Sequence, residues 1–178
     1  MRRHGAVLVG VLFLVPSIGQ AQGTAIELGT GIGASILSAG GTLTLIGAPG
    51  AGVRGQAPLY VSFILPSGFM IQPETSFNIV TGGGETLTTI SVATNAGFLF
   101  SRAATNSAYA AMSGALQFAS FSGSSDSEFA VGARLGYRML VNPGFAVSIE
   151  GGYRRWLDSD LNEITIALRL GGILSAGR

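Results

Sequence analysis

The chain has no cysteine and no lysine, and its only histidine is His4. The absence of cysteine excludes disulfide bonds and thiol chemistry. Charged residues make up 11% of the sequence, whereas a soluble domain carries about 25%. All of the basic side chains are arginine. These shortages remove several side chains that enzymes use as bases or nucleophiles.

Long apolar runs are also missing after the first 21 residues, where no run approaches the roughly 18 residues of a membrane-spanning helix. The chain is nevertheless 47% hydrophobic, with a mean hydropathy of +0.49 and 28 glycines. A closed β-barrel is the other structure that satisfies every backbone polar group in lipid. The composition therefore favours a transmembrane barrel over a helical membrane protein.

The N-terminus has the pattern of a secretory signal peptide. Arg2 and Arg3 precede an apolar stretch from Ala6 to Val15, and small residues lead to a predicted cleavage site after Ala21. An uncleaved anchor is the alternative, but the stretch is short for a span of about 20 residues. Cleavage would leave residues 22–178 as a single barrel domain without histidine. Its 8 arginines against 9 acids give no indication of nucleic-acid binding.

Apolar residues alternate with small or charged residues along most of the remaining chain. Between Phe129 and Met139 every second residue is apolar, and the residues between them are glycine, alanine or arginine. A period of two predicts β-strands, because successive side chains point to opposite faces. An extensive apolar face opposite a small, partly charged face is typical of strands with lipid outside and a polar interior.

Turn signals divide the chain into eight expected strands. Residues 47–58 contain two prolines and interrupt the second strand, and counting its two parts separately would give an odd number of strands. An even number is the rule for such barrels. The prediction is an all-β, eight-stranded, antiparallel up-and-down transmembrane barrel, with strands at 25–37, 42–46 with 59–65, 69–80, 86–100, 107–121, 128–140, 145–155 and 162–173.

Aromatic residues fall near the two ends of these strands. If the N-terminus is periplasmic, one group lies beside the periplasmic turns and the other nearer the outer loops. Such belts are expected where rings sit at the membrane interfaces. The predicted belts are Phe63, Phe69, Phe98, Phe100, Tyr137 and Phe145 at the periplasmic end, and Phe77, Phe118, Phe129, Tyr153 and Trp156 at the other.

The alternation places seven charged residues on the small-residue face, namely Glu27, Glu74, Arg134, Arg138, Glu150, Arg154 and Arg169. Eight strands leave only enough room for side chains to fill the interior, so these charges must pair or keep water. Hairpin register brings Glu150 towards Arg169 and Arg134, and barrel closure brings Glu27 towards Arg169. The expected network is centred on Arg169, Glu150 and Arg134, with Glu27 at its periplasmic end.

From Ala25 to Ile173 the chain resembles the small eight-stranded outer-membrane β-barrel family of the OmpA/OmpX type. The resemblance rests on the strand pattern and not on a sharp motif. It implies export to the cell outer membrane, contact with outer-membrane lipid and insertion by the barrel-assembly machinery. A monomer without cofactor or metal is the expected form.

Catalysis is not expected. The enzymatic outer-membrane barrels resemble one another in using a histidine, which the mature chain lacks. Acids near the predicted loops are interpreted as solvated side chains, although a carboxylate pair or a Ca²⁺ site is the alternative; these are Asp126, Glu128, Asp158, Asp160 and Glu163.

The predicted function is a structural or surface-interaction role for a barrel with a plugged polar lumen. A narrow pore for small solutes or ions is one alternative. A soluble lipid-binding barrel of the lipocalin type is another, but it needs its apolar face inside and a charged exterior.

Overall fold

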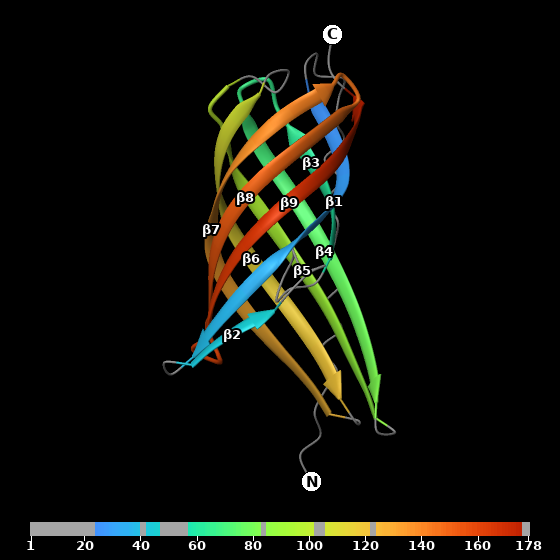
Figure 1. Ribbon diagram of the computed structural model, residues 1–178, viewed down its shortest axis with the longest axis vertical. Coiled ribbons are helices and arrows are strands. Elements are labelled where there is room, and N and C mark those ends of the chain that lie inside the picture. The colour runs from blue at the N-terminus through green and yellow to red at the C-terminus, as the bar shows by residue number, and fades with distance from the viewer. Residues whose placement is uncertain are drawn as a thin grey trace.

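The computed structural model describes residues 24–39, 42–46, 57–82, 85–101, 106–121 and 124–175. The expected signal peptide, residues 1–21, lies outside them. No helix in the described part of the chain is long and apolar enough to cross a membrane. The described residues form nine strands (Figure 1): β1 (Ala25–Ala39), β2 (Thr42–Ile46), β3 (Pro58–Ile64), β4 (Phe69–Gly82), β5 (Glu85–Leu99), β6 (Ser107–Phe121), β7 (Ser124–Asn142), β8 (Phe145–Trp156) and β9 (Asn162–Ser175).

The nine strands form a closed antiparallel barrel with eight strand positions around its circumference, because two short strands occupy one of them. Each strand from β3 to β9 pairs with the next, and β9 closes the barrel by pairing with β1. On its other edge β1 pairs with β3 through residues 25–30 and with β2 through residues 35–39. The short strands β2 and β3 therefore share one barrel position. This confirms the predicted fold and the assignment of both segments to one interrupted strand.

Tight turns join the strands at the end of the barrel where β1 begins. Gly68 in the turn between β3 and β4 has a φ of +86°, a conformation that glycine adopts without steric cost. A Cβ there would lie 2.6 Å from the carbonyl oxygen of Leu99. In the turn between β7 and β8, the Gly144 amide donates to Asn142 Oδ1 at 2.8 Å. The sequence signals Pro66–Gly68 and Asn142–Gly144 thus form the turns predicted from them.

The two faces of the wall differ in the way the alternation predicts. Most large apolar side chains point outward and are exposed, including Leu59, Phe77, Met112, Leu135 and Ile166 at more than 60% each. The buried inward face holds most of the charged and amide side chains of the strands. This distribution is the reverse of that in a soluble protein, and also the reverse of the lipocalin alternative.

The barrel interior contains two small apolar clusters. The first, at the end where β1 begins, consists of Ala25, Ile64, Met70, Leu99, Tyr109 and Ala111. The second consists of Ala93, Ala115, Ala130 and Trp156, with Leu161 packed against it from the turn between β8 and β9. The Trp156 amide donates to the Leu161 carbonyl at 2.8 Å, which holds this turn over the cluster. Buried Ser91 and Gln117 pair with each other beyond Ala93 and Ala115, so the polar interior continues past the second cluster.

The aromatic residues predicted for the belts face outward with one exception. Phe77, Phe98, Phe100, Phe118, Phe129, Tyr137 and Tyr153 are exposed, and Phe63, Phe69 and Phe145 are half-buried on the outer wall. The prediction is wrong for Trp156, which is fully buried inside the barrel. Trp156 is separated from the inward Glu150 and Arg154 by an even number of residues on β8, so its side chain points to the same face of the strand. This alternation decides its direction, although it lies near the end of the strand. Location of the other ten at membrane interfaces stays a prediction.

Replacing Gly136 on β7 by alanine is expected to destabilise the barrel by about 1–3 kcal/mol, the usual effect of overpacking. The new Cβ would lie 2.4 Å from Cζ of Tyr109, a ring that is buried and held by a hydrogen bond to Glu150. Gly114→Ala is the matched control, because the nearest atom to its Cβ would be Phe129 Cζ, at 3.9 Å. Urea midpoints measured in detergent micelles compare the two. Equal midpoints would contradict the steric explanation.

Candidate functional site

Among the residues that the structure describes, eight charged side chains lie in the barrel interior, four glutamates and four arginines. Each occupies an inward position of its strand and is at most 5% exposed. Their formal charges cancel. The eight are Glu27 on β1, Glu74 on β4, Arg134 and Arg138 on β7, Glu150 and Arg154 on β8, and Glu163 and Arg169 on β9.

Glu74 is the centre of this lumen network. Its Oε1 accepts hydrogen bonds from Arg134 Nη2 at 2.7 Å and from Arg154 Nη2 at 3.0 Å. Its Oε2 accepts from Arg134 Nη1 at 3.0 Å and from Arg169 Nη2 at 2.9 Å, with the Asn95 amide at 3.3 Å. Arg134 thus binds Glu74 through both terminal nitrogens, which is the strong bidentate form of the pair.

Glu150 joins two of the same arginines from the opposite wall. Its Oε1 accepts from Arg169 Nε at 2.7 Å and from Arg134 Nη1 at 3.3 Å. Its Oε2 accepts from the Tyr109 hydroxyl at 2.6 Å. The structure therefore contains both contacts expected for Glu150. It also shows that Glu74, a predicted lumen residue for which the hairpin register gave no partner, contacts three arginines from β4 across the lumen.

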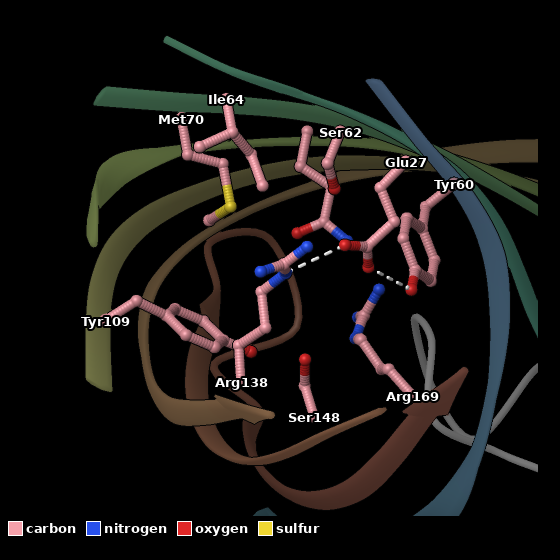
Figure 2. A pocket seen from close by; sticks show the side chains of 10 residues that line it. Glu27, Tyr60, Ser62, Ile64, Met70, Tyr109, Arg138, Ser148 and Arg169 are labelled. Carbon is pink, nitrogen blue, oxygen red and sulfur yellow. Dashed lines mark hydrogen bonds and ion pairs between the residues drawn. The ribbon is translucent and has the colours of Figure 1, made fainter. Parts of the chain in front are cut away.

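Glu27 lies towards the end of the lumen where β1 begins (Figure 2). Its Oε2 accepts from Arg138 Nε at 2.8 Å, and its Oε1 accepts from the Tyr60 hydroxyl at 3.0 Å. The Arg169 guanidinium lies 5.2 Å from the centre of the Tyr60 ring. Barrel closure brings Glu27 and Arg169 to the same small cavity, as expected. The ion-pair partner of Glu27 is Arg138, whereas Arg169 lies over the Tyr60 ring and binds Glu74 and Glu150.

Glu163 belongs to the lumen and not to a solvated loop, so the interpretation of this residue is also wrong. Its Oε1 accepts from Ser35 Oγ at 3.1 Å, and its Oε2 accepts from Trp156 Nε1 at 3.3 Å. The same oxygen lies 3.6 Å from Arg154 Nη1. Two signals were available in the sequence. Glu163 is six residues from Arg169 on the same strand, so both side chains point to the same face. In addition, the predicted lumen set of four arginines and three glutamates has one positive charge without a balancing acid.

Two tyrosine–glycine pairs position carboxylates in the lumen. Tyr60 lies opposite Gly29, and Tyr109 lies opposite Gly136, in the strand register. A Cβ at Gly29 or Gly136 would come within 2.6 Å of the tyrosine ring opposite. Glycine therefore allows each ring to lie against the neighbouring strand, from where its hydroxyl donates to Glu27 or Glu150.

One small cavity, about 10 Å³ in volume, is lined by Glu27, Tyr60, Arg138 and Arg169 among others (Figure 2). That volume is about the size needed for a single water molecule. Arg169 Nη1 is buried without a hydrogen-bond partner in the described part of the chain. The network can thus fill and neutralise the interior, and one water there would complete the bonding of Arg169.

Three of the four remaining loop acids have local partners that the structure shows. Asp160 forms an ion pair with Arg155, Glu128 accepts hydrogen bonds from the Ser159 amide and hydroxyl, and Asp126 accepts from the Ser127 amide. Among the described residues no group of three or more acidic or histidine side chains is arranged to hold a metal ion.

No protein-family model and no curated protein matches the chain. Solved structures do match it. Ail, the attachment invasion locus protein of Yersinia pestis, in complex with the heparin analogue sucrose octasulfate, is 16% identical with a TM-score of 0.59, and the alignment covers 85% of this chain and 97% of Ail. Neisserial surface protein A is 11% identical, with a TM-score of 0.57 and coverages of 84% and 96%. The outer membrane protein OprG from Pseudomonas aeruginosa is 9% identical, with a TM-score of 0.50 and coverages of 85% and 94%. At these identities the likeness shows the fold, that of the outer-membrane β-barrels.

Glu74→Gln is expected to lower the free energy of unfolding by about 3–5 kcal/mol, because it leaves three buried arginines without their shared carboxylate. The exposed Glu85 on the same hairpin provides the control, and Glu85→Gln should change stability by no more than about 0.5 kcal/mol. Equilibrium unfolding in urea with lipid vesicles measures both. A similar small effect for both variants would show that the network does not stabilise the barrel.

Trp156, the only tryptophan in the chain, is expected to escape quenching by lipids brominated on their acyl chains, because its ring lies inside the wall. A matched probe moves the indole to the outer wall three residues earlier on β8, by Tyr153→Trp with Trp156→Phe. Fluorescence of the folded proteins in brominated and ordinary vesicles is compared. Strong quenching of Trp156 in the wild type would place it in the belt after all.

Proposed function

We propose that this chain is an outer-membrane β-barrel with a structural or surface-interaction role. Its lumen is plugged and conducts no solute. The observation that carries this proposal is the interior, where four buried glutamates and four buried arginines neutralise one another. An interior filled in this way is a plug, since each charge is bound by side chains instead of by passing ions or water.

The outer wall supports location in a membrane. Exposed leucine, isoleucine, phenylalanine and methionine side chains occur on strands all around the barrel. Pairing of β9 with β1 closes the hydrogen-bonded ladder, which is the condition for strands to span lipid. Export by the predicted signal peptide, insertion by the barrel-assembly machinery and a monomeric state are parts of this proposal.

The sheet of β4 to β7 supports a surface role. It extends beyond the turn between β8 and β9 (Figure 1), and it is exposed on both faces at Phe77–Ile79 and Ser124–Ser127. This extension is rich in serine and threonine and offers hydroxyls and exposed apolar side chains together. Two neighbours in fold have names that refer to attachment and to the cell surface, and this agrees with the surface role that we propose.

A narrow pore is the second candidate function. The cavity beside Arg138 and Arg169, at about 10 Å³, favours it only weakly, because this volume accommodates about one water molecule. Catalysis has less support: Glu74 and Glu150 each bind arginines, which leaves these carboxylates engaged in ion pairs rather than poised for proton transfer.

Purified wild-type protein in a planar lipid bilayer is expected to give no discrete conductance steps. A neutral variant with the centre of the network removed should conduct, because water then fills the lumen; it carries Glu74→Ala, Arg134→Ala, Glu150→Ala and Arg169→Ala. A shift in SDS-gel mobility on boiling verifies that each protein is a folded barrel. Regular conductance steps from the folded wild type would refute the sealed lumen and favour the pore.

A further inference from the structure

Two arginines of the lumen flank one serine at the end of the barrel where β1 begins. In the strand register, Ser148 on β8 pairs with Arg138 on β7 and with Arg169 on β9. The three side chains share one row on the inner face, and they point into the same space in Figure 2. All three line the cavity of about 10 Å³. The row therefore places two positive charges and a hydroxyl beside one small space.

The side chains around this space offer more hydrogen-bond donors than they use. Arg169 Nη1 is buried and has no hydrogen-bond partner in the described part of the chain. Ser62 on β3 and Gln72 on β4 line the same cavity from the opposite wall. Among the described residues, the side chains of Ser62, Gln72 and Ser148 make no hydrogen bond. One guanidinium nitrogen, two hydroxyls and one amide are thus available to a single ligand.

The charge that lines this space is positive. Its charged side chains are those of Arg138, Arg169 and Glu27. Both oxygens of the Glu27 carboxylate already accept a hydrogen bond, one from Arg138 Nε at 2.8 Å and one from the Tyr60 hydroxyl at 3.0 Å. Two arginines against one glutamate leave the lining with one positive charge in excess.

The acid that completes the charge balance of the lumen lies far from this space. Without Glu163, the lumen network consists of four arginines and three glutamates. Glu163 is six residues from Arg169 along β9, which corresponds to about 20 Å of strand. Its carboxylate accepts hydrogen bonds from Ser35 and Trp156. The network is therefore neutral as a whole but polarised, with its positive end at the cavity.

We propose that this cavity binds one halide ion, chloride being the abundant one, which accepts hydrogen bonds from Arg169 Nη1, Ser148 and the two polar side chains of the opposite wall. A water molecule would complete the bonding of Arg169 but would leave the positive charge of the lining unbalanced. A halide is only slightly larger than water, so it suits a space for about one water molecule, whereas phosphate and sulfate are too large. Ile64 and Met70 complete the lining and are at most 5% exposed, and this separation from solvent strengthens the charge-assisted bonds.

Crystals of the folded barrel grown in sodium bromide test the site directly. Anomalous scattering at the bromine absorption edge should show one peak in the lumen, between Ser148 and Arg169. A cavity that holds water gives no anomalous peak there, and this result would overturn the inference. Peaks confined to the protein surface would identify an adventitious ion only and would overturn it as well.

Urea unfolding in detergent micelles measures the binding in solution. At constant ionic strength, sodium gluconate, whose anion is too large for the cavity, is replaced stepwise by sodium chloride. The ratio of folded to unfolded wild-type protein should rise about elevenfold at a chloride concentration ten times the dissociation constant. Equal urea midpoints in the two salts would contradict the proposal.

Three variants connect the chloride effect to this cavity. Ser148→Val fills the space and removes a donor, so it should abolish the chloride dependence. Thr165→Val is the matched control, since Thr165 is also a buried inward hydroxyl residue but does not line the cavity; it should keep the full effect. Ser62→Ala removes a donor without adding bulk and should reduce the effect, even if Ser148→Val does not fold. An unchanged chloride effect in Ser62→Ala, and in Ser148→Val where it folds, would place the ion elsewhere and overturn the inference.

Discussion

Charge balance in a space without bulk water is the constraint on which the rest of this structure depends. Four arginines inside the barrel require four acids, because an uncompensated charge there costs several kcal/mol. Glu74 supplies one of these four charges and contacts Arg134, Arg154 and Arg169 at once. The shared carboxylate ties β4 to β7, β8 and β9 across the lumen, so the network braces the wall as well as neutralising it.

The small residues of the inner face serve this network. Gly29 and Gly136 leave room for the rings of Tyr60 and Tyr109, whose hydroxyls bind Glu27 and Glu150. Larger side chains at the glycines would push the rings away from the carboxylates. The cavity beside Glu27 and Arg169 has a volume of only about 10 Å³, and the low local dielectric of such a packed interior strengthens the ion pairs. The lumen network therefore depends on the glycines of the barrel wall that leave room for the two tyrosine rings.

Much of the fold and part of the site could be predicted from the sequence. Alternation and turn residues identified every strand position, and neighbouring strands in a hairpin placed Glu150 beside Arg169 and Arg134. Prediction failed where contacts cross the lumen or where the end of a strand was interpreted by position alone. Glu74 reaches its arginines from the far wall, and no hairpin register relates β4 to β9. Glu163 and Trp156 lie near a turn, but the alternation of side chains along their strands places both on the inner face.

The sequence by itself determined which face of each strand is polar, because a period of two assigns every side chain to one side of the wall. It also determined that the interior would hold arginines and glutamates. Only the tertiary structure decided which of them bind one another, since closure of the barrel sets the distances across the lumen.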